Sequence, residues 1–493
     1  MRCLAHRFLN LVTKIPLFAL SDQKFFPLNK SFHEITVYCG PKCIRPTFEC
    51  RHNPPPSPHQ SQFCNTCRCG PAATPLDRQI PCHKGLTAAR QINTVAGLLD
   101  MLEEPDVTTQ LSDTVALLGD LIAFPTVSEL SNLDMIAYLA HLLEQSGAQV
   151  DIYHDDIGHK ANLFATIGPQ KDGGIVLSGH SDVVPVAEQD WSSPPFEMIE
   201  HDGRLYGRGT CDMKGFIAAA VSMAPYFNQI VRDRPVHFAF TYDEEVGCFG
   251  ARALVESLRE KGITPGVAII GEPTSMRIIE GHKGCYEYTT RFSGLAGHGS
   301  SPDRGVNAVE YAVRYVTRLL SLKEELRKRS PESSRFAPPW STINTGSLIG
   351  GVAHNVIASH AQVEWEMRPV QASDAEFVKH DLHSFCEEEL LPAMRAICPD
   401  AEIATEVIGE VEGLEPADSN EARNIVMELT GSNSADVVPF GTEAGIFQSF
   451  GMSAVVCGPG SIEQAHKPDE YVSIDQLQQC LDMLGRLGRK LAA

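Results

Sequence analysis

The chain contains 493 residues, too many for one hydrophobic core, so two folded domains are expected. Its formal net charge of -21 argues against nucleic acid as a partner, because proteins bind phosphate backbones with clustered Lys and Arg. No run of about 18 apolar residues occurs, which argues against a membrane-spanning helix.

Residues 1–105 form a separate segment that is basic and rich in Cys and Pro. Residues 44–83 show neither helical nor strand periodicity, so we expect an extension that is disordered or incidental to the fold. A targeting segment at 1–20 and a zinc site in the cysteines at 64–69 are the alternatives. The seven cysteines after this segment show no paired spacing, which favours reduced thiols and a cytoplasmic location.

The next part of the chain has regular hydrophobic patterning. Amphipathic helices are expected at 112–124 and 135–146. From Gly174 onward, short apolar runs alternate with helical patterns, as in a parallel sheet that is buried on both faces. The expected strands are 175–177, 237–241, 267–270 and 454–456, and the expected helices are 215–227, 251–261 and 475–491. We therefore predict an α/β domain with a central, mostly parallel sheet, formed by residues 106–282 and 411–493.

The segment between these parts, residues 283–410, has a different pattern. Apolar and polar residues alternate at 286–292 and 361–368, as in strands with one exposed face. Helices are expected at 306–327 and 374–397, with a last strand at 402–408. This β-α-β-β-α-β order predicts an inserted, ferredoxin-like α+β domain.

Acids and histidines follow four of the predicted strands: His180 and Asp182, Glu244 and Glu245, Glu272, and His466. Ligands of open α/β sheets collect at the carboxyl ends of the strands. The sequence therefore predicts that these side chains meet at one site.

Taken singly, these residues have ordinary structural explanations: His180 as a structural histidine, Asp212 as a helix N-cap, and the acids at 243–245 as a solvated charge run. Adjacent acids at the end of a buried strand would repel each other, however. Two cations would remove that repulsion and give the neighbouring glutamates separate roles as ligand and base. The spacing of His180 and Asp182 suits a metal-bound imidazole whose second nitrogen is held by a carboxylate.

Five motifs resemble those of the M20 metallopeptidase family. They are Gly-His-Ser-Asp-Val-Val-Pro at 179–185, Gly-Arg-Gly-Thr-Cys-Asp-Met-Lys-Gly at 207–215, Asp-Glu-Glu-Val-Gly at 243–247, Gly-Glu-Pro-Thr at 271–274 and Gln-Ala-His-Lys-Pro at 464–468. The resemblance extends from about Leu111 to the C-terminus. Within the family, the amino-acid sequence at 244–248, 282–284 and 440–445 is most similar to that of the acetylornithine deacetylase branch.

The resemblance implies a zinc-peptidase-like domain with two zinc ions, for which cobalt is an alternative, and removal of the acetyl group from N-acetylornithine. The implied metal ligands are Asp212 as a bridge, His180 and Glu272 in one site, and Glu245 and His466 in the other. Glu244 is implied as the general base, with Asp182 beside His180.

The resemblance also implies roles for three residues of the insert. His298 matches a family histidine that reaches the active site of a partner subunit, which implies a homodimer. Arg368 and Asn355 match residues that meet the carboxylate of the substrate, a role that suits a bidentate Arg contact. A salt bridge within the insert explains Arg368 equally well.

Other functions use the same ligands. Succinyl-diaminopimelate desuccinylases, aminoacylases and dipeptidases of the family share the implied chemistry, so the ligand set does not separate them. A non-catalytic binding protein is an alternative of another class. It would be expected to have lost a metal ligand or Glu244, and this sequence has all of them.

Overall fold

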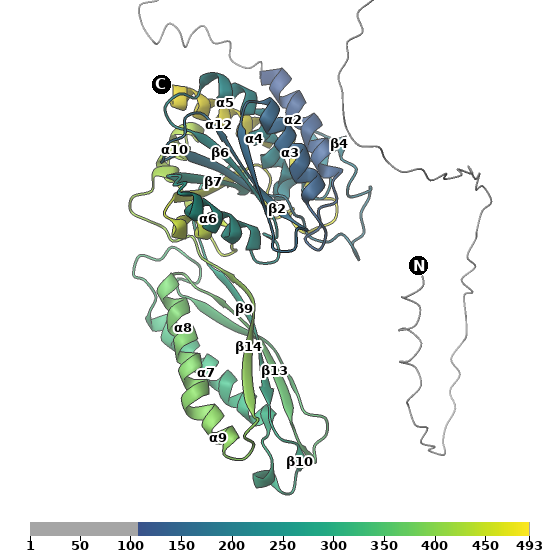
Figure 1. Ribbon diagram of the computed structural model, residues 1–493, viewed down its shortest axis with the longest axis vertical. Helices are drawn as coiled ribbons and strands as arrows, with labels where there is room; N and C mark the ends of the chain where they lie inside the picture. Colours follow the sequence, from purple (N-terminus) through teal and green to yellow (C-terminus); the bar gives the residue numbers. More distant parts are fainter. Residues whose placement is uncertain (1–106, 493) are drawn as a thin grey trace, which may run out of the picture. The chain divides into compact units, whose positions relative to one another are not determined.

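The computed structural model describes residues 107–492 of the chain. The expected extension at 1–105, with its proposed targeting segment and its cysteine cluster, lies outside the described residues. Two main sheets organise the described part, one with eight strands and one with four (Figure 1).

The eight-stranded sheet has four parallel strands at its centre. Its order is β1 (Gln149–His154), β2 (Ala161–Ile167), β6 (Val236–Thr241), β3 (Ile175–His180), β7 (Val267–Pro273), β16 (Ser453–Gly458), β8 (Ile279–His282) and β15 (Asp436–Val438). Strands β6, β3, β7 and β16 pair in parallel, whereas β2 and β8, which flank them, run antiparallel to their inner neighbours. The predicted mostly parallel sheet is confirmed.

Helices cover both faces of this sheet (Figure 1). One face packs against α2 (Val107–Ile122), α3 (Leu133–Gln145), α4 (Gly215–Ser222), α5 (Ala224–Ile230), α10 (Glu421–Thr430) and α12 (Ile474–Ala492); the other packs against α6 (Phe249–Lys261) and α11 (Ala444–Phe450). Successive strand residues enter opposite cores: Ile175 and Leu177 belong to the first and Val176 to the second. This explains why the strands are apolar without alternation.

The single helix expected at 215–227 is wrong, because the chain forms α4 and α5 with a break at Met223. Pro225 lies in the first turn of α5. Its nitrogen carries no hydrogen to continue the α4 hydrogen-bond ladder, so a new helix starts there.

The insert is an antiparallel sheet with helices on one face. Its sheet order is β11 (Thr342–Gly350), β13 (His360–Arg368), β9 (Cys285–Ser293) and β14 (Glu402–Val411). The helices α7 (Ala308–Lys328), α8 (Ala372–Phe385) and α9 (Leu391–Arg395) close the core, and a π-helical turn at Cys386–Leu390 divides the helix expected at 374–397. The chain order β9-α7-β11-β13-α8-β14 confirms the predicted ferredoxin-like insert.

Short elements complete the fold. A three-stranded sheet contains β4 (Ile199–His201), β5 (Arg204–Tyr206) and β17 (Tyr471–Ser473), and a two-stranded one pairs β10 (Gly297–His298) with β12 (Val356–Ile357). Two short helical turns lie at Thr210–Lys214 and Pro302–Arg304. Between residues 107 and 492 no helix combines the length and apolar character needed to cross a bilayer. The seven cysteines of this part of the chain are all unpaired, as their spacing predicted.

Candidate metal centre

The acids and histidines singled out in the sequence lie together at the carboxyl end of the parallel strands. Strands β3 and β7 are longer than predicted, so His180 is the last residue of β3 and Glu272 lies within β7. Glu244 and Glu245 occupy the turn after β6, and His466 lies in the loop after β16. Ligand atoms of two overlapping groups lie within 4.8 Å of one another: His180, Glu244 and Glu272, and His180, Asp212 and Glu245.

Asp212 lies between the two histidines. Its Oδ1 is 3.0 Å from Nε2 of His180, and its Oδ2 is 3.4 Å from Nε2 of His466. The second histidine is also 3.0 Å from Oε2 of Glu245. One carboxylate thus faces a different imidazole with each oxygen, the arrangement that a ligand bridging two cations requires.

Asp212 is not the N-cap of a helix. It lies in the π-helical turn at Thr210–Lys214 with non-helical backbone angles, and Lys214 is the residue that precedes α4. Its side chain therefore caps no helix and instead faces His180 and His466.

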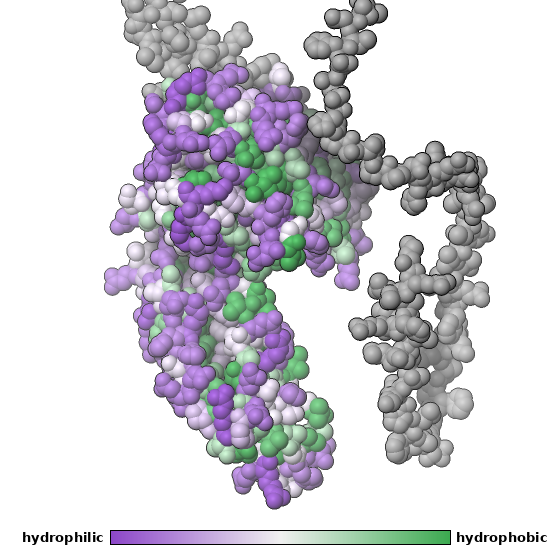
Figure 2. Space-filling model, viewed as in Figure 1, coloured by the Kyte–Doolittle hydropathy of each residue, from purple (hydrophilic) through white to green (hydrophobic). Residues whose placement is uncertain are grey.

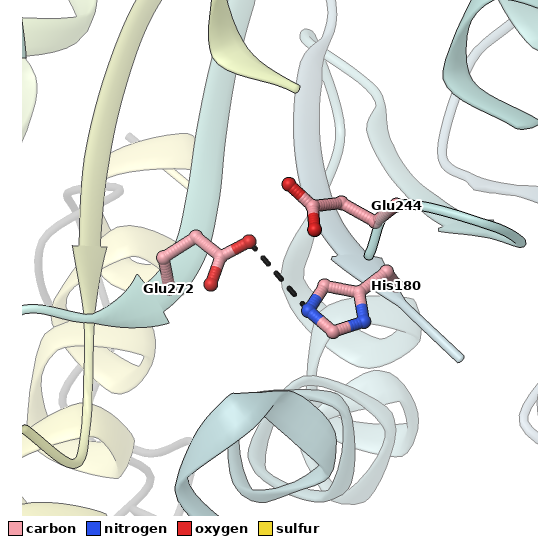
Figure 3. Close-up of side chains that lie close together, drawn as sticks. All are labelled: His180, Glu244 and Glu272. Atoms are coloured by element: carbon pink, nitrogen blue, oxygen red, sulfur yellow. Dashed lines mark ion pairs between the residues drawn. The ribbon is translucent and has the colours of Figure 1, made fainter. Parts of the chain in front are cut away.

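Glu272 completes the other side of the cluster. Its Oε1 is 3.7 Å from Nε2 of His180 and has no hydrogen-bond partner within the described part of the chain, although it is buried. Figure 3 shows the carboxylates of Glu244 and Glu272 both facing the His180 ring. A buried carboxylate oxygen without a donor is costly, and a cation at this position would satisfy it.

The electrostatics of the cluster also call for cations. Burial is the largest influence on Glu244 and Glu245 and, with the neighbouring carboxylates, raises the pKa of Glu244 to about 8 and that of Glu245 to about 7. Burial and Asp212 likewise raise the pKa of Glu272 well above its usual value. Divalent cations would hold all of these groups ionised.

The donor set fits zinc-like metals. Imidazole and carboxylate ligands are those that zinc prefers in catalytic sites. Nδ1 of His180 lies 2.9 Å from the backbone oxygen of Asp182, so it serves as the donor of that contact and leaves Nε2 directed at the cluster. The residues present can therefore hold two divalent metal ions.

Contrary to the prediction from the sequence, the carboxylate of Asp182 does not hold the His180 ring but contacts the turn that carries Glu244 and Glu245. Its carboxylate is 3.6 Å from Nδ1 of His180, so the backbone oxygen rather than the carboxylate holds the ring. The carboxylate instead accepts hydrogen bonds from the backbone N–H groups of Glu244 and Glu245, at 3.1 and 3.3 Å, and from the hydroxyl of Ser128 at 2.7 Å. Asp182 thus ties the β3 end to the turn that carries both glutamates.

The run of three acids at 243–245 is not a solvated charge run. Asp243 forms an ion pair with Lys160, which also donates to the backbone oxygen of Ser128. The first acid is therefore neutralised by its own partner. The side chains of Glu244 and Glu245 point toward the cluster.

Sequence reasoning missed Glu470, which holds the loop that carries Asp212. Its fully buried carboxylate pairs with Arg208 at 2.7 Å and accepts hydrogen bonds from three backbone N–H groups, those of Gly209, Cys211 and Asp212, at 2.9 to 3.2 Å. Glu470 lies four residues beyond His466, so one short segment supplies a predicted ligand and the support of another. Nothing in the spacing pairs it with the loop at 207–215.

Glu443 is a buried acid directly before α11, in the segment 440–445 whose sequence resembles the acetylornithine deacetylase branch. Its two carboxylate oxygens accept hydrogen bonds from the hydroxyls of Ser178 at 2.5 Å and Thr241 at 2.8 Å. Those hydroxyls lie on β3 and β6, two residues before His180 and three before Glu244. Glu443 therefore links β3 and β6, the two strands that lead to His180 and to Glu244.

The three candidate residues of the insert lie outside the cluster. His298 and Asn355 are neighbours at the paired strands β10 and β12, where the N–H of Gly299 donates to the oxygen of Asn355 at 2.8 Å. His298 is exposed, and its Nδ1 is 2.8 Å from the hydroxyl of Ser300. Arg368 ends β13 and forms the expected salt bridge within the insert, to Glu366 at 2.8 Å.

Known proteins are similar to this chain in sequence and in fold. A family model described as peptidase family M20/M25/M40 matches residues 176–490. Acetylornithine deacetylase of Klebsiella pneumoniae (strain 342) is 34% identical over 374 residues, which cover 74% of this chain and 94% of that protein.

Two solved structures share the architecture at lower identity. An M20 family metallo-carboxypeptidase from Sulfolobus solfataricus is 16% identical with a TM-score of 0.59, over 77% of this chain and 99% of that one. A dinuclear metal binding peptidase of the M20 family from Bacillus subtilis is 16% identical with a TM-score of 0.54, over 77% and 98%. The chain therefore belongs to peptidase family M20/M25/M40, a family of metal-dependent hydrolases.

Proposed function

We propose that this enzyme hydrolyses N-acetyl-L-ornithine to L-ornithine and acetate, a step of arginine biosynthesis, with two zinc ions. The proposed ligands are Asp212 as the bridge, His180 and Glu272 for one ion, and Glu245 and His466 for the other. The observation that carries the proposal is the carboxylate of Asp212, whose two oxygens face the two histidines. The 34% identity to an acetylornithine deacetylase supports the choice of substrate.

The chain's own residues supply proton transfer and orientation. When bound, the metal ions would polarise the amide carbonyl and activate water for attack. Glu244, which faces the same space as His180 and Glu272, would take a proton from the attacking water and deliver it to the departing amine. Asp182 would hold Glu244 in place through the hydrogen bond that its carboxylate accepts from the backbone N–H of Glu244.

Substrate selection would fall to the insert. We propose that Arg368 and Asn355 meet the carboxylate of the acylated amino acid, since a guanidinium can bind a carboxylate through two parallel hydrogen bonds. Glu366, the present partner of Arg368, would be displaced or shared when substrate binds. The unpaired cysteines support a reducing, cytoplasmic setting for the enzyme.

An activity panel tests this proposal against its alternatives. The zinc-loaded protein is expected to hydrolyse N-acetyl-L-ornithine with a higher kcat/KM than N-acetylmethionine, N-succinyl-diaminopimelate or dipeptides. Preference for one of the other substrates would assign the chain to another deacylase or peptidase of the family. No hydrolysis of any of them by metal-loaded protein would favour the non-catalytic binding homologue.

We further propose that residues 283–410 form a lid through which two chains make a homodimer. Large apolar side chains are exposed on this insert, and Figure 2 shows hydrophobic residues at its surface among hydrophilic ones. They include Val313 and Leu320 of α7, and Leu348 and Ile349 of β11. Because β11 is an edge strand of its sheet, it also offers backbone groups for pairing. In such a dimer His298 would donate to the oxyanion in the partner's site.

Mixing two inactive variants tests whether His298 acts across the dimer. Glu244→Gln and His298→Ala chains are each expected to be nearly inactive alone. After unfolding and refolding together, half of the dimers are mixed, and one of their two sites has both residues, so about a quarter of the wild-type activity should return. Mixing Glu244→Gln with Asp212→Ala is the control. Both residues belong to the site of their own α/β domain, so each site of a mixed dimer lacks one of them and no activity should return.

The outcome separates two arrangements. Activity that stays at the level of the unmixed variants would show that His298 serves its own chain or plays no catalytic part. Light scattering on the wild-type protein measures the dimer independently of turnover.

A further inference from the structure

The turn that carries Glu244 closes on itself and brings a cysteine to the carboxylate of this residue. The backbone N–H groups of Gly247 and Cys248 both donate to the backbone oxygen of Glu244, at 3.0 and 3.1 Å. Cys248 has a φ of 55°, in the left-handed region, and directly precedes α6. As a result its sulfur lies 3.5 Å from Oε1 of Glu244.

The environment of Cys248 makes it a hydrogen-bond donor. Its side chain belongs to the core beneath the sheet, with Ala251 and Leu254 of α6, and the residue is only 2% exposed. Burial, reinforced by the charge of Glu244, raises the pKa of the Cys248 thiol well above its usual value, so the sulfur carries its proton. Beside a carboxylate held ionised by bound cations, a protonated thiol acts as the donor; the backbone oxygen of Glu244, 3.7 Å from the sulfur, is its other acceptor.

No other side chain between residues 107 and 492 has a hydrogen bond to the carboxylate of Glu244. Asp182 contacts the backbone N–H of Glu244, and the neighbouring Glu245 is directed toward His466 instead. A glutamate side chain has several rotatable bonds, and holding it in one rotamer costs entropy. Among the described residues, the thiol of Cys248 is therefore the one side-chain hydrogen-bond partner of the Glu244 carboxylate.

We propose that Cys248 is a positioning residue, whose thiol holds the carboxylate of Glu244 toward the metal centre. This inference rests on the proposed role of Glu244 as general base. A Lys or Arg in the same place would bind the carboxylate more tightly but would compete with the proton that the base must accept. A neutral, weak donor fixes the direction of the carboxylate and leaves its oxygens available.

Substitutions at Cys248 test the proposal by turnover. Cys248→Ala removes the donor, and Cys248→Ser keeps one; both retain a Cβ, so the strain at the positive φ is the same. Loss of one weak thiol–carboxylate hydrogen bond is expected to lower kcat about fivefold in Cys248→Ala, with KM and zinc content unchanged, and Cys248→Ser should recover most of the lost kcat. Cys457→Ala is the matched control, because Cys457 is equally buried but contacts Met276 and Met483 rather than the cluster.

Infrared spectroscopy tests the contact without any substrate. The difference spectrum between wild type and Cys248→Ala isolates the S–H stretching band of this thiol. All samples are zinc-loaded, so that the Glu244 carboxylate of the wild type is ionised. In Glu244→Gln the acceptor is neutral and weaker, so the band should move to higher frequency, while the band lost in Cys457→Ala stays in place. A Cys248 band that does not move, or a kcat of Cys248→Ala equal to that of wild type, would overturn the inference. Failure of the whole substrate panel would refute the proposed function instead, and the infrared result would still stand.

Discussion

Replacing Glu244 with Gln is expected to lower kcat by about 10²–10⁴-fold while the protein keeps its metal, because general-base catalysis contributes about that much. Gln has nearly the shape of Glu, but its amide cannot accept the proton of the attacking water. The predicted ligands remain in place around it, with Oδ1 of Asp212 3.0 Å from His180 and Oε2 of Glu245 3.0 Å from His466. Steady-state kinetics together with metal analysis of the same preparation measure both quantities.

A matched control is Glu256→Gln, on the exposed side of α6, where the side chain forms an ion pair with Arg259. It should leave both kcat and metal content unchanged. If Glu244→Gln loses metal in proportion to activity, Glu244 is a ligand rather than a base. An unchanged kcat would remove it from the mechanism altogether.

Replacing Asp212 with Ala is expected to weaken both metal sites together and abolish measurable turnover. The reason is geometric, since its two carboxylate oxygens face His180 and His466 separately. Asp212 is one of the charges that raise the pKa of Glu245 and Glu272, so its removal lowers both pKa values, and weaker metal binding would reflect the lost ligand rather than added repulsion. Isothermal titration with zinc measures the affinity of each site.

Glu272→Ala is the informative comparison for the bridge. It removes a ligand that is near His180 only, so one site should weaken and the other, with Glu245 and His466, should still bind. Equal loss at both sites in the two variants would show that Asp212 has no special bridging position.

The parts of the fold that could be predicted are those that depend on local pattern. Continuous apolar runs such as 267–270 belong to strands buried on both faces, and alternation at 361–368 marks a strand with one exposed face. The site followed from the same pattern, because parallel strands end at one edge and their terminal polar residues must meet there.

The remaining features depend on contacts between distant segments. Glu470 pairs with Arg208 across 262 positions of the chain, and Glu443 reaches Ser178 across 265, so no local spacing reveals them. The strands β10 and β12 are two residues each and exist only because they pair. That the backbone oxygen of Asp182 holds His180 could not be predicted either, since it depends on the conformation of one turn.

The zinc content of wild-type protein, purified without chelator and measured by atomic emission, tests the central claim most directly. Two ions per chain are expected, because the two oxygens of the Asp212 carboxylate face His180 and His466 separately and are proposed to join two sets of ligands. A preparation that binds no divalent metal, even after zinc is added in excess, would contradict the account of this site as a two-metal hydrolase centre.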